Sequence, residues 1–298
     1  MNRAFIQMAY FLSVAFTGTT ALATQPVPSA VAATIHSVQP PAWIFRDNKR
    51  YPAAPGVKII KDDYLLTDRQ GRIHLALANG LLARIGSSSR AGIINHSNYG
   101  ATAIRLAFGT LRITDEMGFS SNQQQLNIIT SHGTIHVHSG DLFATSATNE
   151  TVVAMIEGEV TISSGSSSRI VSLSQPLSVT RLPNLDTLPV ATRDATAGFP
   201  DRVRQTDIDA DSIAVTPEGA WSAHLVSLPG INPARDIARL LRRYGYPVDL
   251  RKISSGEKTW YRLSVDRLQS RHAALLLSER LKAWDTIKTP WVEQTGHQ

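Results

Sequence analysis

The sequence contains no cysteine, so disulfides and thiolate metal sites contribute neither stability nor chemistry. After its first two dozen residues it has no apolar run long enough to cross a bilayer. It also lacks the nucleophile-elbow motif of hydrolases and the glycine-rich phosphate loop of nucleotide-binding proteins. These absences predict a protein that is not an enzyme and that needs no cofactor.

The first 23 residues have the layout of a secretory signal peptide. Met1, Asn2 and Arg3 precede an apolar run over residues 4–14, and small residues follow up to Ala23. An uncleaved membrane anchor is the alternative, but the apolar core is short and interrupted. We therefore expect export to the periplasm and a mature chain that is not an integral membrane protein.

The excess positive charge of the chain lies at one end. Residues 219–298 hold thirteen Lys and Arg against seven Asp and Glu, whereas the preceding 218 residues hold seventeen of each. A basic segment of this kind favours an anionic partner: nucleic acid, membrane head groups or an acidic polymer.

Residues 35–182 consist of short alternating apolar runs separated by turn residues. Such runs flank Asn79-Gly80, a pair that accepts the positive φ of a tight hairpin turn, and a second reversal is predicted at His132-Gly133. No stretch has sustained helical periodicity, which indicates an all-β domain. The next segment, residues 183–218, carries seven acids against three arginines and is predicted to be a flexible linker, although an acidic tether could also lie across the basic end.

The last segment, residues 219–298, predicts an α+β domain of order βαββαβ, which buries two helices against one face of a four-stranded sheet and leaves the other face open. Asn232 and Ser270 are placed to cap the helices, Pro233 suits the first helical position, and Gly245 suits the left-handed residue that ends the first helix. The expected strands span 221–228, 247–253, 259–265 and 288–294, and the helices 232–244 and 271–284. The predicted buried stripe of the second helix comprises Ala273, Leu276, Leu277, Leu281 and Trp284.

Two family resemblances accompany these patterns. "WSAHLVSL", "ARLLRRYGY", "WYRLSVDRL" and "AALLLSERLK" resemble the SPOR domain over residues 219–295, which implies binding to peptidoglycan glycan strands that lack stem peptides, as at division septa. "IHLALANGLLARIGSSS", "LAFGTLRI", "IITSHGTIHVHSGDLFATSA" and "VAMIEGEVTIS" resemble the FecR-type domain over residues 55–163, which implies a β-rich fold without catalysis. The first resemblance departs from its family at His224, where glutamine is typical, and at Val226-Ser227-Leu228 in place of Gly-Ser-Phe.

The SPOR resemblance and the strand pattern together yield a candidate glycan site. Alternation turns Tyr261, Leu263 and Val265 toward the helices, so Trp260, Arg262 and Ser264 share the open face with Ser222 and His224. An arginine can bind a muramic lactyl carboxylate through two hydrogen bonds, and a tryptophan can stack on a sugar ring. The predicted site residues are His224, Ser227, Trp260, Arg262 and Trp291, of which Trp260 comes from the strand pattern alone.

Other functions stay open as alternatives. A βαββαβ sheet with basic and aromatic residues is also typical of RNA recognition, although export disfavours it. FecR-type signalling proteins pass a signal through a membrane to a sigma factor, and here the FecR-like domain is expected to act as an interaction scaffold for an envelope partner. An accessory lytic enzyme lacks an evident catalytic carboxylate. His132, His136 and His138 lack further ligands at a recognisable spacing, so we expect no metal site.

Overall fold

The computed structural model describes residues 31–95, 102–115, 126–164, 170–173, 178–183, 186–188, 204–208 and 212–295. The predicted signal peptide and much of the predicted linker lie outside these residues. The described chain is mostly β and has two separate hydrophobic cores. We call residues 31–188 the β unit and residues 212–295 the C-terminal module.

The β unit is built from strands alone within the described residues, as its alternating sequence predicts. Its strands are β1 (Val31–Gln39), β2 (Ala42–Arg46), β3 (Lys49–Pro52), β4 (Lys58–Ile60), β5 (Tyr64–Thr67), β6 (Arg72–Leu77), β7 (Leu82–Ile85), β8 (Arg90–Asn95), β9 (Thr102–Thr114), β10 (Leu126–Ile129), β11 (Gly133–Ser146), β12 (Thr151–Ser164), β13 (Ile170–Leu173), β14 (Ser178–Leu182) and β15 (Asp186–Leu188).

Both predicted hairpin reversals of the β unit are confirmed. Strands β6 and β7 pair antiparallel around Gly80, whose φ of 84° is the left-handed value that the turn needs. Strands β10 and β11 pair antiparallel on either side of His132. The main path of the sheet runs β15-β14-β12-β11-β10-β9-β7-β6-β1-β4, and β2, β3, β5, β8 and β13 join it from the side.

A facing pair of glycines bends the two longest strands of the β unit. Gly140 on β11 lies opposite Gly158 on β12, with φ values of 95° and 102°, and the strand register shifts on both sides of Gly140. A Cβ atom on Gly140 would lie 2.1 Å from the Glu157 carbonyl oxygen, so no other residue fits without movement. The bent ribbon helps the sheet to enclose one apolar core.

The C-terminal module has the predicted βαββαβ order. Its elements are β16 (Trp221–Leu228), α3 (Ile231–Arg243), β17 (Asp249–Ser255), β18 (Lys258–Leu268), α4 (Arg271–Leu281) and β19 (Trp291–Gln294). The sheet order is β17-β18-β16-β19, with every neighbouring pair antiparallel. Both helices contribute to one core with the inward residues of β16 and β18, so they cover the same face. Among the described residues, no helix is long and apolar enough to cross a membrane.

Helix α3 starts two residues earlier than the predicted cap, Asn232, implies. The N-cap is Gly230, which makes no side-chain capping bond, and Asn232 lies inside the first turn. Pro233 is therefore the third helical residue, where its missing N–H costs little because first-turn amides lack intrahelical acceptors. The predicted end is confirmed: Gly245 has φ 82°, its N–H donates to the Arg242 carbonyl, and the Tyr246 N–H donates to that of Leu241.

Helix α4 has the predicted cap but is shorter than predicted. The Ser270 hydroxyl accepts a hydrogen bond from the Ala273 N–H at 3.0 Å. The helix ends at Leu281 instead of the predicted residue 284, and Lys282 is its C-cap. Leu276 is 37 % exposed, so its predicted burial was wrong. The buried face comprises Ala273, Ala274, Leu277, Ser278 and Leu281.

Two parts of the predicted linker pack against the rest of the chain. Residue Val215 forms β-bridges with Val38 of β1 and with Leu268 of β18, so a single residue joins the two sheets. Residues 204–208 lie on the β unit, where the Asp207 carboxylate pairs with Arg84 at 2.8 Å and Arg112 at 3.4 Å. These stretches are fixed rather than flexible; the domain boundaries themselves stay a prediction.

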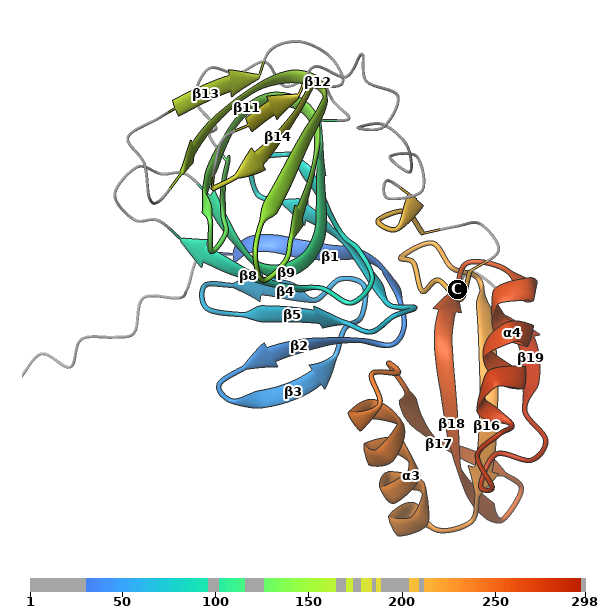
Figure 1. Cartoon of the computed structure of the whole chain (residues 1–298). Coiled ribbons are helices and arrows are strands. Elements are labelled where there is room, and N and C mark those ends of the chain that lie inside the picture. Colours follow the sequence, from blue (N-terminus) through green and yellow to red (C-terminus); the bar gives the residue numbers. More distant parts are fainter. Residues whose placement is uncertain are drawn as a thin grey trace, which may run out of the picture.

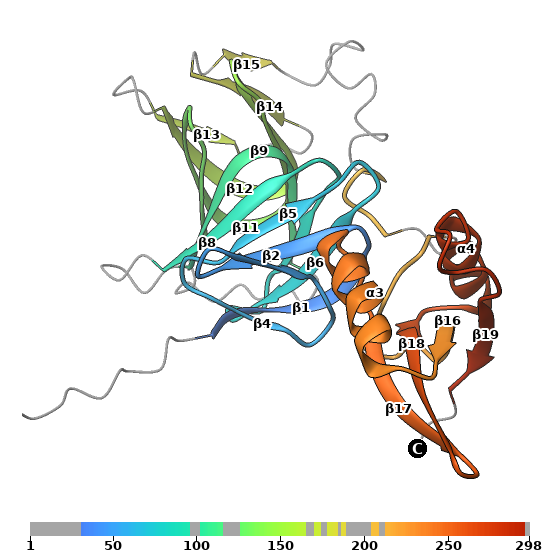
Figure 2. The same ribbon diagram turned by 90° about the horizontal axis from the view of Figure 1, so that it is seen from below.

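The β unit and the C-terminal module also touch at the end of α3. The Trp43 indole donates to the Arg243 carbonyl at 3.2 Å, and the Ala42 N–H approaches the Gly245 carbonyl at 3.5 Å. Figures 1 and 2 show α3 beside the β2–β3 hairpin in both views. The β unit therefore contacts the C-terminal module at the C-terminal end of α3.

Candidate functional site

The face of the C-terminal sheet that lies opposite its helices carries both charged and aromatic side chains. Leu263 and Val265 belong to the core and Tyr261 packs against it, which confirms their predicted orientation. The alternate residues of each strand therefore face away from the helices. They are Asp249, Arg251 and Ile253 on β17, Trp260, Arg262, Ser264 and Asp266 on β18, Ser222, His224 and Ser227 on β16, and Trp291 and Glu293 on β19.

Four of the five predicted site residues form one contact group, which we call the Arg262 cluster: His224, Ser227, Arg262 and Trp291. The Arg262 guanidinium carbon lies 5.0 Å from the centre of the Trp291 ring, and the His224 and Trp291 ring centres are 4.9 Å apart. Arg262 also donates from Nε to the Ser227 hydroxyl at 3.4 Å. Residues distant in the sequence thus meet because β18 and β19 both pair with β16.

The fifth predicted residue, Trp260, shares the face but stands apart from the cluster. It lies two positions before Arg262 on β18 and pairs with Ile253 of β17. Within the described residues, no ring contact or hydrogen bond joins its side chain to the Arg262 cluster. A ligand that contacted both tryptophans would have to extend across β18 and β16.

His224 is held as an uncharged side chain. Burial, followed by the nearby charge of Arg262, lowers the pKa of its imidazole, and the hydrogen bond to Glu293 only partly opposes this. Its Nε2 lies 2.9 Å from the Glu293 carboxylate, so a neutral ring donates there and leaves Nδ1 as an acceptor. Nδ1 is buried and has no hydrogen-bond partner among the described residues. The ring therefore orients Trp291 and can accept one hydrogen bond.

The face is less open than the strand pattern predicted. Ser222, Ser264 and His224 point to it but are only 0 %, 1 % and 7 % exposed, because longer side chains cover them. The accessible members include Arg251, Glu293 and Trp291, the last at 38 % exposure.

Sequence reasoning also missed the charged residues beside the predicted site. Asp266 accepts hydrogen bonds from the Ser222 hydroxyl, at 2.7 Å, and from Arg251. Asp249 and Glu293 add two further carboxylates to the same face. The alternation of "PVDLRKI" could have identified Asp249 and Arg251, since Leu250 between them is apolar.

The excess positive charge lies mainly outside this face. Helix α3 holds four exposed arginines, namely Arg235, Arg239, Arg242 and Arg243, whereas the sheet face combines Arg251 and Arg262 with three carboxylates. The excess charge of residues 219–298 is therefore concentrated on α3 and not on the sheet face. What the face offers is one arginine, Arg262, beside an aromatic ring.

In the β unit, the candidate histidines each have a separate polar neighbour. His132 Nδ1 lies 3.0 Å from the Thr151 hydroxyl, His136 Nδ1 lies 2.7 Å from the Asn127 amide oxygen, and His138 Nε2 lies 2.9 Å from the Thr161 hydroxyl. Groups of three or more His, Asp and Glu that could hold a metal ion do not occur among the described residues.

Comparison with known proteins supports the FecR-like part of the chain. Residues 63–161 match the family model described as FecR protein, which spans β5 to most of β12. The SPOR resemblance has no such support, and no curated protein matches the chain.

Two similar solved structures are both described as candidate anti-sigma factors from Parabacteroides distasonis. One has a TM-score of 0.36 and 10 % identity, with 78 % of this chain and 99 % of that chain covered. The other has a TM-score of 0.35 and 7 % identity, with 66 % and 96 % covered. Likeness at this level does not indicate a shared function.

Proposed function

We propose that this chain is an envelope regulatory protein of the FecR type, in which the β unit contacts a protein partner. The observation that carries the proposal is the FecR match over residues 63–161. Val215 forms β-bridges with strands of both sheets, so the C-terminal module is in direct contact with the β unit.

The regulatory role is tested by gene deletion in the native host. We expect the loss of the chain to change the transcript levels of a discrete group of genes and a plasmid copy to restore them. A transcript profile that is unchanged under both ordinary growth and cell-wall stress would contradict this role. Expression of an unrelated exported protein from the same plasmid is the control.

The second candidate function is binding of an acidic glycan by the Arg262 cluster, which would place the protein on cell-wall glycan strands without stem peptides. The cluster supports it because a guanidinium and an indole lie within 5.0 Å of one another on the same face. A sugar polymer with one carboxylate per repeat needs this pairing of charge and flat ring.

The same geometry disfavours nucleic acid. Asp249, Asp266 and Glu293 surround the face and would repel a closely spaced run of phosphates. In a glycan the carboxylates are farther apart, and neutral hydroxyls can donate to the protein's acidic groups. The glycan proposal therefore uses the carboxylates of the face, whereas RNA recognition would oppose them.

Retention of the full chain on peptidoglycan sacculi, before and after amidase treatment, tests glycan binding. We expect amidase treatment to increase retention, and Arg262→Ala with Trp291→Ala to reduce it about tenfold or more, since one charge-assisted hydrogen bond contributes ~1.5–3 kcal/mol. The control is Arg239→Ala with Leu240→Ala, which removes an arginine and an exposed apolar side chain from α3. Equal retention by the two double variants would reject the site.

A further inference from the structure

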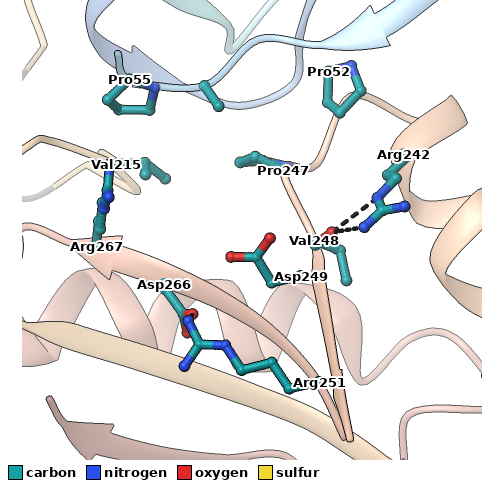
Figure 3. Close-up of a pocket in the computed structure, with 11 residues that line it drawn as sticks. Pro52, Pro55, Val215, Arg242, Pro247, Val248, Asp249, Arg251, Asp266 and Arg267 are labelled. Atoms are coloured by element: carbon teal, nitrogen blue, oxygen red, sulfur yellow. Dashed lines mark hydrogen bonds and ion pairs between the residues drawn. The ribbon is translucent and has the colours of Figure 1, made fainter. Parts of the chain in front are cut away.

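A pocket lies between the β unit and the C-terminal module, and no member of the Arg262 cluster lines it. One side is formed by Pro52, at the end of strand β3, and by Ala54 and Pro55 just after it; the start of β17 and the end of β18 form the other. Its volume is about 380 Å³, within the range of roughly 300–1,000 Å³ typical of small-molecule sites. Figure 3 shows the two prolines facing Asp249 across the cavity.

The walls of the pocket are fixed by hydrogen bonds. The Val215 N–H donates to the Val38 carbonyl at 2.8 Å, and the Thr216 N–H donates to the Arg267 carbonyl at 2.9 Å. On the other side, the Arg242 guanidinium donates twice to the Val248 carbonyl, at 2.8 and 2.6 Å. The cavity is therefore formed before any ligand arrives, which lowers the ordering cost of binding.

Five charged side chains line the pocket; among the described residues Arg242, Arg251 and Asp266 have partners, whereas Asp249 and Arg267 do not. Asp266 and Arg251 pair with each other, and Ser222 donates to Asp266 as well. Among the described residues, no hydrogen bond or ion pair engages the Asp249 carboxylate or the Arg267 guanidinium. Figure 3 shows the Asp249 carboxylate pointing into the cavity, toward the side formed by Val215 and Arg267.

The surroundings of Asp249 favour a positively charged ligand group. The carboxylate is reachable by solvent yet enclosed by protein on several sides, as expected in a concave pocket. Burial, followed by the negative charge of Asp266, raises its pKa, although Arg251, Arg242 and Arg267 oppose the shift. A ligand cation beside Asp249 would relieve this penalty, whereas Arg267 across the pocket favours an anion.

We propose that the pocket binds a small zwitterion, such as an amino acid or a short peptide. Its ammonium group binds Asp249, its carboxylate binds Arg267, and its apolar part lies beneath Pro52 and Pro55. Because residues of both units line the pocket, the bound ligand would hold the β unit and the C-terminal module together. This inference does not depend on glycan binding or on the regulatory role.

The test is calorimetric titration of the full chain with dialanine, alanine, N-acetyl-dialanine and dialanine amide. We expect dialanine to bind with a Kd of about 1 mM or tighter. Each blocked form lacks one charged end and should bind about tenfold more weakly. Tighter binding of dialanine than of alanine identifies a peptide ligand, and equal binding identifies a free amino acid. Absence of dialanine binding, or binding of either blocked form as tightly as dialanine, overturns the proposal.

Variants that remove one charge each assign the two ends of the ligand to their binding residues. Asp249→Asn should weaken dialanine binding about tenfold and abolish the preference for a free ammonium group. Arg267→Gln should also weaken binding about tenfold and abolish the preference for a free carboxylate. The controls Asp236→Asn and Arg235→Gln change matched charges on the exposed side of α3 and should bind as the wild type does. Unfolding curves confirm that all four variants fold. Wild-type affinity in Asp249→Asn or in Arg267→Gln would overturn the assignment.

Discussion

Charged side chains are used differently in the β unit and in the C-terminal module. In the β unit, the Asp63 carboxylate is 1 % exposed and accepts from Arg46 Nε at 2.8 Å, from Arg46 Nη2 at 2.5 Å and from the Ile60 N–H at 2.9 Å. In the module, Arg262 has one hydrogen bond, at 3.4 Å, and rests on Trp291. Arginine in the first setting completes the fold, whereas in the second it remains available to a ligand.

The same contrast applies to Arg112 of the β unit. Its guanidinium donates to both oxygens of Asp141, at 2.9 and 2.6 Å, and also to Asp207 of the linker segment. Strand position alone does not distinguish Arg112 from Arg262, because both lie at half-buried positions on strands. The number and geometry of their partners do: Arg112 is held by the Asp141 carboxylate, whereas Arg262 remains available to a ligand.

The largest effect that tests this contrast is expected for Asp63→Ala. Loss of the carboxylate leaves Arg46 and the Ile60 N–H without their acceptor, which should lower the free energy of unfolding by about 3 kcal/mol. Arg262→Ala should cost less than about 1 kcal/mol, since an exposed cation–π contact contributes little. Urea denaturation of both variants gives the two values. Equal destabilisation would mean that Arg262 too is structural.

A smaller effect is expected at His74, where the linker segment meets the β unit. His74 Nε2 donates to the Thr206 carbonyl at 2.9 Å, and burial is the main reason that the pKa of the ring is lowered from 6.5 to about 4. Because the folded pKa lies below the unfolded one, the unfolded chain takes up the proton first as the pH falls. Stability is therefore full above about pH 6.5 and decreases toward pH 4.

Between about pH 7.5 and pH 5, His74 alone should account for about 2 kcal/mol of lost stability. Unfolding curves of the wild type and of His74→Gln at both pH values isolate this contribution, because the other histidines titrate in both proteins. We expect the variant to lose less stability than the wild type over this interval. The same pH dependence in both would show that His74 does not control the acid sensitivity.

Much of the fold could be predicted because its signals are local. The turn at Gly80 requires a positive φ, the end of α3 requires Gly245, and strand alternation placed Arg262 and Trp260 on the face away from the helices. Four of the predicted site residues are in contact because strand order, rather than sequence distance, brings them together.

The rest depends on contacts that no local pattern encodes. The register of β16 shifts between His224 and Val226, which changes the neighbours of Ser227. The fixing of residues 204–208 depends on arginines more than 90 positions earlier in the chain. The pocket beneath Pro52 exists only because two sheets far apart in the sequence meet. Composition could show that residues 183–218 are acidic but not that Asp207 has partners.

The β-bridges of Val215 limit where the polypeptide can be divided for study. A fragment that begins at residue 219 loses the strand segment beside Leu268 and removes one wall of the pocket, while a fragment that ends before residue 212 exposes the backbone of Val38. Cutting the chain between residues 212 and 219 would leave unpaired strand edges on both fragments, and such edges promote aggregation. Binding and stability of the β unit and of the C-terminal module should therefore be measured on the intact chain and not on separate fragments.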